Sequence, residues 1–380
     1  MSVSLLRRSA LALLASFLVS AAPLRASAQR ATDSSSSSFA SLVARLSEPG
    51  GYFDSDNIIT NEASYLQISS QLEKQHVHGG IYIGVGPDQN FSYIALIRPT
   101  MAFMLDIRRD NLLEHLLFKS YFEVARNRLE YLCLLLGKPA PADLDKWTGR
   151  PMGEVLAYIG ETKVDSAFVS ATRRASNARI DRYGVALDAR DHQVIDRYRA
   201  IFVRDGLDTR YSSLGRNNRN NYPSFGRLMM ETDRAGRLLS YLADETAYQF
   251  VRSMQLRDRI VPVVGNVAGD KAVKAIAQYA TEHHENVEAF YLSNVEQYLM
   301  TREGGFDSYA RNVKLLPHDS TGVIIRSYFG GFTMSHPLYV PSPGNLSASM
   351  IEPIHSFLRA FAAGELFNYP QLVSRGYVTP

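Results

Sequence analysis

The stretch from Gly79 to Asp110 constrains the fold more than any other part of this 380-residue chain. Two short apolar runs, Ile81 to Ile83 and Met101 to Leu105, flank a glycine-containing turn and a weakly helical segment, Phe91 to Ile97. Short apolar runs bounded by turn residues are typical of buried strands. The order strand, turn, helix, strand therefore predicts a βαβ unit, which is the building block of an α/β protein.

The turn after the first run has the chemistry of a ligand-binding loop. Gly84 and Gly86 would let a ligand approach the backbone closely, and the next helix begins with unpaired N–H groups. Asp106 ends the second run 22 positions after Gly84, where an acid can accept hydrogen bonds from ribose hydroxyls. A third glycine is missing and Pro87 lacks an N–H, which argues against a dinucleotide and favours a nucleoside ligand without phosphates. The alternative is a tight turn with no ligand.

A second unit of the same kind lies between residues 260 and 292. The apolar runs Ile260 to Val264 and Val287 to Leu292 flank a predicted helix capped by Asp270. We expect these strands to pair in parallel with a right-handed crossover. Thr321 to Tyr328 is a further predicted strand. Two such units predict an open, mostly parallel, doubly wound sheet that binds ligands at the carboxyl ends of its strands.

The layout of strand, Gly-x-Gly, helix, strand and Asp resembles motif I and the ribose acid of class I S-adenosylmethionine-dependent methyltransferases. This resemblance covers only Gly80 to Asp106. It implies a Rossmann-like, methyltransferase-like fold in which Gly84 and Gly86 line S-adenosylmethionine, Asp106 holds its ribose, and Asp88 is a further candidate cofactor-binding residue.

After Phe39, most of the chain also resembles a family of bacterial exported proteins of unknown function with that Rossmann-like fold. The segments that carry this resemblance are Gly51–Asn57, Gly84–Asn90, Asp106–Leu112 and Tyr291–Tyr298.

Two candidate catalytic residues follow the Val287–Leu292 run. Methyltransferases that act on amino groups carry an acid or Asn there, followed by two prolines and an aromatic residue. This chain has Asn294 and Glu296 without the prolines, so that specificity does not transfer. Asn294 and Glu296 remain pocket candidates, and the alternative is that Asn294 only caps the helix Val295 to Met300.

The N-terminus has the pattern of a signal peptide. Arg7 and Arg8, the apolar stretch Ala10 to Val19 and the small residues before Gln29 predict cleavage after residue 28 and export to the periplasm or beyond. The Ser-rich residues 29–38 are a predicted flexible spacer. Cleavage removes three arginines and no acid, so the formal charge of +3 becomes zero and gives no case for nucleic-acid binding. No later apolar run reaches the roughly 18 residues of a transmembrane helix.

Residues 111–257 are a predicted helical insertion within one Rossmann-like domain over residues 39–380. Asp110 is expected to cap a long helix, Asn111 to Leu136, and Cys133 to be a core thiol. Residues 171–237 hold fourteen arginines against eight acids. This Arg-rich segment is either a site for an anionic envelope molecule or a solvated helical face with a surface loop.

The sequence indicates no metal centre. His76 with His78, and His283 with His284, have no evident third ligand. The polar stretch from Asp54 to Glu62 is better explained by turns and caps than by a cation site. We therefore expect an exported methyltransferase-like protein with an S-adenosylmethionine or nucleoside site. The alternative is a non-catalytic envelope or secreted protein that binds an anionic or nucleoside-like small molecule on the same fold, and the sequence leaves both catalysis and oligomeric state open.

Overall fold

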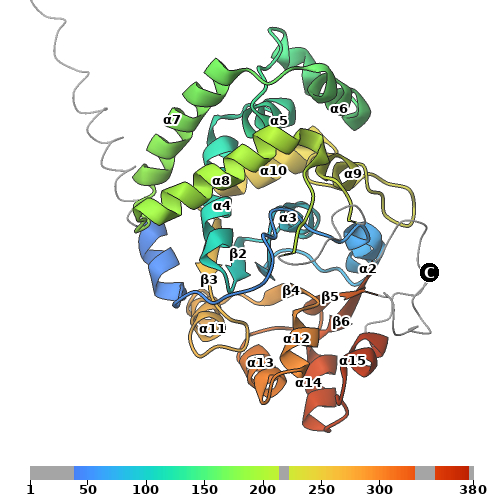
Figure 1. Ribbon diagram of the computed structural model, residues 1–380. Coiled ribbons are helices and arrows are strands. Elements are labelled where there is room, and N and C mark those ends of the chain that lie inside the picture. The colour runs from blue at the N-terminus through green and yellow to red at the C-terminus, as the bar shows by residue number, and fades with distance from the viewer. Residues whose placement is uncertain (1–37, 214–221, 330–346, 376–380) are drawn as a thin grey trace, which may run out of the picture.

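A computed structural model of the chain describes residues 38–213, 222–329 and 347–375 (Figure 1). Six strands form one sheet in the order β3-β2-β1-β4-β5-β6. Neighbouring strands are parallel except β5 and β6, which are antiparallel. The expected α/β fold with an open, mostly parallel sheet is thus confirmed. The strands are β1 (Ile81–Gly84), β2 (Met101–Asp106), β3 (Ile260–Val264), β4 (Val287–Ser293), β5 (Val323–Phe329) and β6 (Ser347–Pro353).

The three strands β1, β2 and β3 are buried at every position, which explains why their sequences are continuous apolar runs rather than alternating ones. Helices cover both faces of the sheet (Figure 1). On one side α3 (Asn90–Ile97), α4 (Arg109–Val124) and α10 (Glu245–Leu256) pack together. An outer layer beyond them contains α5 (Arg128–Leu136), α6 (Met152–Glu161), α7 (Ser166–Arg182) and α8 (Ala189–Asp205).

The opposite side is covered by helices that follow β3 in the chain. They are α11 (Ala272–Glu282), α12 (Val295–Met300), α13 (Gly305–Val313), α14 (Ile354–Ala362) and α15 (Tyr369–Arg375). Shorter elements fill the periphery: a helix over residues 38–46, η1 (Tyr65–Ile68), α2 (Ser69–Lys74), η2 (Leu144–Trp147), η3 (Gly206–Asp208) and α9 (Phe225–Met229). Buried apolar side chains from Phe39 to Val373 form one continuous core, which includes Cys133 as expected.

The predicted long helix from Asn111 to Leu136 is wrong, because the chain breaks it into α4 and α5. Ala125 adopts an extended conformation (ψ 126°), and the Asn127 side chain then caps α5 by accepting the Glu130 N–H at 2.9 Å. Asp110 makes no cap. It lies in the first turn of α4 and pairs with Arg197 at 2.8 Å.

Two expectations for the second unit also need correction. Asp270 does not cap α11, because a residue far away in the sequence does so: Glu48 Oε2 accepts the Lys271 N–H at 3.2 Å and the Ala272 N–H at 3.4 Å. The strands β3 and β4 are in the same sheet but do not pair, because β2 and β1 lie between them. Strand β6 was not anticipated from the sequence. The predicted signal peptide and residues 29–37 of the predicted spacer lie outside the described residues.

Candidate functional site

A cavity of about 340 Å³ opens at the carboxyl ends of the parallel strands. Residues at or just after the ends of β1 to β4 line it, namely Gly86, Asp106, Asn266 and Asn294. The strand order reverses between β1 and β4, and this is the position where open α/β sheets bind ligands. The volume is within the range of small-molecule sites.

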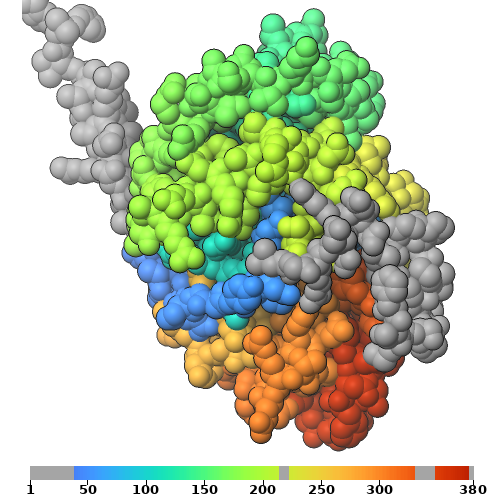
Figure 2. All heavy atoms as spheres, viewed as in Figure 1, coloured from blue at the N-terminus to red at the C-terminus, as the bar shows by residue number. Residues whose placement is uncertain are grey.

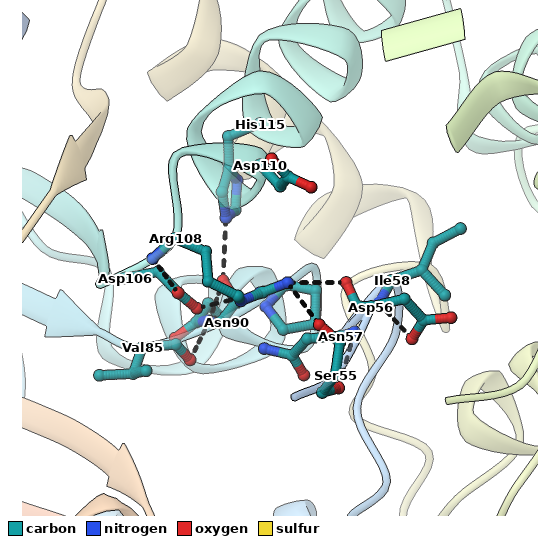
Figure 3. A network of polar contacts seen from close by, with 12 residues as sticks. Ser55, Asp56, Asn57, Ile58, Val85, Asn90, Asp106, Arg108, Asp110 and His115 are labelled. Atoms are coloured by element: carbon teal, nitrogen blue, oxygen red, sulfur yellow. Dashed lines mark hydrogen bonds and ion pairs between the residues drawn. The ribbon is translucent and has the colours of Figure 1, made fainter. Parts of the chain in front are cut away.

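The segment from residue 48 to residue 62 crosses this edge of the sheet and forms one wall of the cavity (Figure 2). Arg108, which follows β2, holds the segment in place (Figure 3). Its Nη1 donates to the carbonyl oxygens of Ser55 at 3.2 Å and Asp56 at 2.8 Å. Its Nη2 donates to Asp106 Oδ2 at 3.2 Å. Burial is the largest single influence on the pKa of this guanidinium and lowers it, but Asp106, Tyr198 and Glu114 together raise the pKa above its ordinary value, so Arg108 stays charged.

The two predicted glycines have different roles. Gly86 lines the cavity at φ 89°, a conformation that favours glycine, and a Cβ there would lie 3.2 Å from Asn57 Nδ2. Gly84 does not line it. A Cβ at Gly84 would lie 1.9 Å from Asn90 Oδ1, and the Asn90 amide holds the turn by donating to the Val85, Gly86 and Pro87 carbonyl oxygens. Gly84 therefore serves the packing of the turn rather than the cavity.

Of the two predicted acidic residues, Asp106 and Asp88, only one lines the cavity. Asp106 lines the cavity, and its Oδ1 accepts the Arg108 backbone N–H at 2.8 Å while Oδ2 accepts the guanidinium. Each carboxylate oxygen has a second lone pair that can accept a bond from a ligand. Asp88 does not line this cavity. It is buried beside Tyr241, whose hydroxyl donates to it at 3.1 Å, and burial raises its pKa to about 7.

The same division applies to the catalytic candidates. Asn294 lines the cavity at the N-cap position of α12, but its side chain makes no capping hydrogen bond. Glu296 is fully buried behind the cavity and accepts from Arg326 Nη2 at 3.1 Å. The structure thus brings together Gly86, Asp106 and Asn294 and leaves Gly84, Asp88 and Glu296 outside the cavity.

The structure adds residues that the sequence did not single out. Glu62 is only 1% exposed, yet it lines the cavity and accepts hydrogen bonds from the Ser293 and Ser327 hydroxyls. Burial raises the pKa of the Glu62 carboxyl, and these hydrogen bonds oppose that effect. Ser293 lies 231 positions from Glu62, so no local pattern could have connected them.

Aromatic side chains surround the polar residues of the cavity. Phe53 and Tyr298 meet edge to face at 5.2 Å, and Tyr211 and Tyr222 at 5.1 Å. Tyr52 is 74% exposed. Aromatic faces of this kind can stack on a planar ring. The aromatic residues of the lining are Tyr52, Phe53, Tyr211, Tyr222, Tyr291, Tyr298 and Phe329.

Six arginines of the Arg-rich segment pair with acids in the described part of the chain. Arg197 pairs with Asp110 at 2.8 Å, Arg227 with Glu231 at 2.9 Å and Arg237 with Asp233 at 2.7 Å. Further pairs join Arg173 and Arg199 to Asp196, and Arg204 to Asp205. These six arginines are therefore engaged within the protein, and both interpretations of the segment stay predictions.

The described ranges hold no group of three or more His, Cys, Asp or Glu side chains placed to bind a metal ion. None of their helices has the length and apolar character that crossing a membrane requires.

Residues 57–140 and 186–367 match the model of a domain of unknown function, DUF7790. No curated protein matches the chain. The matched ranges contain every residue of the cavity lining except Tyr52 and Phe53, whereas residues 141–185, which form η2, α6 and α7, lie outside the match. Because the match covers more than half of the chain, the protein belongs to the DUF7790 family.

Proposed function

We propose that this protein binds a nucleoside-like molecule without phosphates and acts as an exported methyltransferase-like protein. S-adenosylmethionine is the first candidate for this ligand. One observation carries the proposal. The cavity at the reversal of strand order contains Gly86 and Asp106, two of the three residues that the methyltransferase resemblance assigns to the cofactor and its ribose, whereas the third, Gly84, does not line it.

The residues present fit the chemistry of such a ligand. Asp106 has lone pairs left to accept hydrogen bonds from two ribose hydroxyls, and Arg108 neutralises its charge without covering it completely. Gly86 allows a close approach to the backbone, and the aromatic lining offers faces for a purine. Pro87 removes an N–H from the turn, which suits a ligand that needs no phosphate cradle. S-adenosylmethionine, when bound, would supply an electrophilic methyl group.

The test is calorimetric titration of residues 29–380 with S-adenosylmethionine and S-adenosylhomocysteine. We expect micromolar binding to the wild type and at least tenfold weaker binding to Asp106→Asn, because a hydrogen bond to a charged group contributes about 1.5–3 kcal/mol. Asp110→Asn is the matched control, since Asp110 is near in sequence but pairs with Arg197 away from the cavity lining. Absence of binding to well-folded wild-type protein would contradict the proposal.

The predicted export favours a second candidate function. S-adenosylmethionine is made in the cytosol, and an exported chain would meet little of it. A non-catalytic envelope or secreted protein that uses the same cavity for another nucleoside-like or anionic ligand is therefore the alternative. Ligand binding without methyl transfer to any hydroxyl or amine acceptor would support it.

A further inference from the structure

The carboxyl group of Glu62 lies on the cavity wall without a cation among its hydrogen-bond partners in the described residues. The Ser293 hydroxyl donates to one oxygen and the Ser327 hydroxyl to the other. Two other buried acids near the cavity, Asp106 and Glu296, are instead paired with arginine, Asp106 with Arg108 and Glu296 with Arg326. A buried acid with neutral partners only is costly to ionise, so Glu62 can exchange a proton where the paired acids cannot.

The backbone aims Ser293 at this carboxyl group. Ser293 ends β4 at φ 54°, a left-handed conformation that a residue other than glycine rarely adopts. The pairing of β4 with β5 shifts register between Tyr291 and Ser293, and such irregularities redirect side chains. The Ser293 hydroxyl consequently lies between Glu62 and Asn294 Oδ1, which is 3.4 Å away, and all three residues line the cavity.

A chain of hydroxyl groups leads from Glu62 away from the cavity. Ser327 Oγ lies 3.5 Å from Ser349 Oγ, which lies 3.2 Å from Ser64 Oγ. Ser64 Oγ lies 2.7 Å from Ser347 Oγ. Because each hydroxyl can donate and accept at once, the chain can relay a proton from Glu62 as far as Ser347, itself buried, without a charged side chain.

We infer that Glu62 and Ser293 form a proton-accepting pair for a hydroxyl or amine group of a bound substrate. The substrate O–H or N–H bond breaks and its proton goes to Ser293 Oγ, while the Ser293 hydroxyl proton goes to Glu62, which becomes a neutral acid. The electron pair left on the substrate oxygen or nitrogen forms the new bond to the methyl carbon of an alkyl donor, and the bond from that carbon to its leaving sulfur breaks with its electrons staying on sulfur. The inference rests on the proposed function for the identity of this donor.

The surroundings of Glu62 suit this role. Burial is the largest influence on its pKa and raises it, whereas the hydrogen bonds from Ser293, Ser327 and Tyr291 lower it. The titratable groups that face it are phenols, from Tyr82 on β1, Tyr93 on α3, Tyr291 on β4 and Tyr369 on α15. Burial raises the pKa of each phenol, so they stay neutral. General bases work best when their pKa lies near the working pH, and the shift moves Glu62 in that direction.

Diisopropylcarbodiimide, a small neutral reagent, tests the pair in the free protein. A protonated carboxyl group gives its proton to a carbodiimide nitrogen, its oxygen bonds to the central carbon, and rearrangement leaves an N-acylurea that retains the whole reagent. Peptide mass spectrometry locates the adduct. We expect labelling of Glu62 that persists above pH 4.5 and is lost in Glu62→Gln. Glu114 is the internal reference, because it is a fully buried carboxyl group with a raised pKa outside the cavity lining, and it should stay unlabelled.

Two serine variants test whether the Ser293 hydroxyl influences the protonation of Glu62. Ser293→Ala should move the pH midpoint of Glu62 labelling upward, because the ionised carboxylate loses a hydrogen-bond donor. Ser308→Ala, which removes an exposed hydroxyl beside Arg311 on α13, should leave the midpoint unchanged. An unlabelled Glu62, or labelling that follows the pH profile of surface carboxyl groups, overturns the inference.

The carbodiimide experiment tests the proton-accepting pair and the calorimetric experiment tests the proposed function, so each can be contradicted without the other. Binding of S-adenosylhomocysteine with an unlabelled Glu62 overturns the proton-accepting pair and leaves the proposed function standing. Labelled Glu62 with the expected midpoint shift, in a protein that does not bind S-adenosylhomocysteine, supports the pair and contradicts the proposed function.

Discussion

At the scale of single residues, three buried acids near the cavity differ in what they contact. Asp106 meets the Arg108 guanidinium, and Glu62 meets two serine hydroxyls. Glu114, on α4, has no hydrogen-bond partner for either carboxylate oxygen within the described part of the chain, and its side chain is fully buried. Burial raises the pKa of Glu114 well above 4.5, Asp88 raises it further, and Arg108 opposes both effects.

Replacement of Glu114 by methionine should stabilise the protein in a pH-dependent way. In the wild type the raised pKa of Glu114 means that the folded state holds a proton that the unfolded state releases above about pH 4.5. Wild-type stability from this group is therefore fully present below that pH and is lost as the pH rises toward the folded pKa. The Glu114→Met variant does not lose stability in this way. The difference between its free energy of unfolding and that of the wild type should therefore grow with pH, to about 1–3 kcal/mol near neutrality.

Urea unfolding of both proteins at pH 5 and pH 8 measures this difference. Glu123→Gln, on the same helix, is the control, because Glu123 is partly exposed and lies 3.5 Å from Lys119. That variant should lose a little stability with no gain toward high pH. An advantage of Glu114→Met that does not change with pH would contradict the prediction.

At the scale of elements, a buried ion network fixes α12 against the sheet. Arg326 on β5 has no exposed surface and donates to Glu296 at 3.1 Å and to Glu352 Oε2 on β6 at 2.7 Å. Glu296 follows Asn294 by two positions at the start of α12. The network therefore places Asn294 at the cavity, and it gives Glu296 a positioning role instead of contact with a ligand.

Loss of Arg326 should be far more damaging than loss of a peripheral arginine. Arg326→Met leaves Glu296 buried without its cation and leaves Glu352 with only the partly exposed Arg375, and breaking a buried pair costs about 3–5 kcal/mol. Arg375→Met is the comparison, because Arg375 also contacts Glu352, at 3.2 Å, but is partly exposed, and it should cost no more than about 1 kcal/mol. Chemical denaturation measures both, and equal losses would show that the network does not anchor α12.

Elements also differ in how far the sequence predicts them. The strands β1 to β4 were anticipated to within a residue, because strands buried by helices on both faces need unbroken apolar runs. The break after α4 was missed because the whole stretch keeps a helical apolar period across Ala125 and Asn127. The cap of α11 was assigned to Asp270 because it is the nearest acid, although the actual partner, Glu48, is more than 220 positions away.

At the scale of the whole molecule, the order of the strands creates the cavity. The chain moves outward from β1 through β2 to β3, then crosses the sheet to β4 and continues to β5 and β6 on the other side. Strand ends on both sides of this crossover contribute to the lining, as Asp106 does after β2 and Asn294 after β4. Helices α6 and α7, outside the family match, lie in the outer layer away from this edge (Figure 1).

Export of the whole chain is a separate prediction. When the full-length chain is expressed in a bacterial host, we expect recovery from the periplasm or the medium with Gln29 as the first residue. Intact-mass spectrometry of the recovered protein checks the cleavage site. A variant with Arg7 and Arg8 replaced by glutamate should accumulate inside the cell, because the n-region loses its positive charge. Recovery of the uncleaved wild-type chain from the cytosol would contradict the prediction.

The sequence by itself determined the α/β class, the central strands and three cavity residues, Gly86, Asp106 and Asn294. Local chemistry is enough for these, since apolar runs, turn glycines and acids at strand ends act over a few neighbouring positions. Only the tertiary structure decided that Asp88 and Glu296 turn away from the cavity and that Glu62 and Ser293 meet in it. Such contacts depend on which strands become neighbours and which side chains fill the space between distant segments, and no local period in the sequence encodes that.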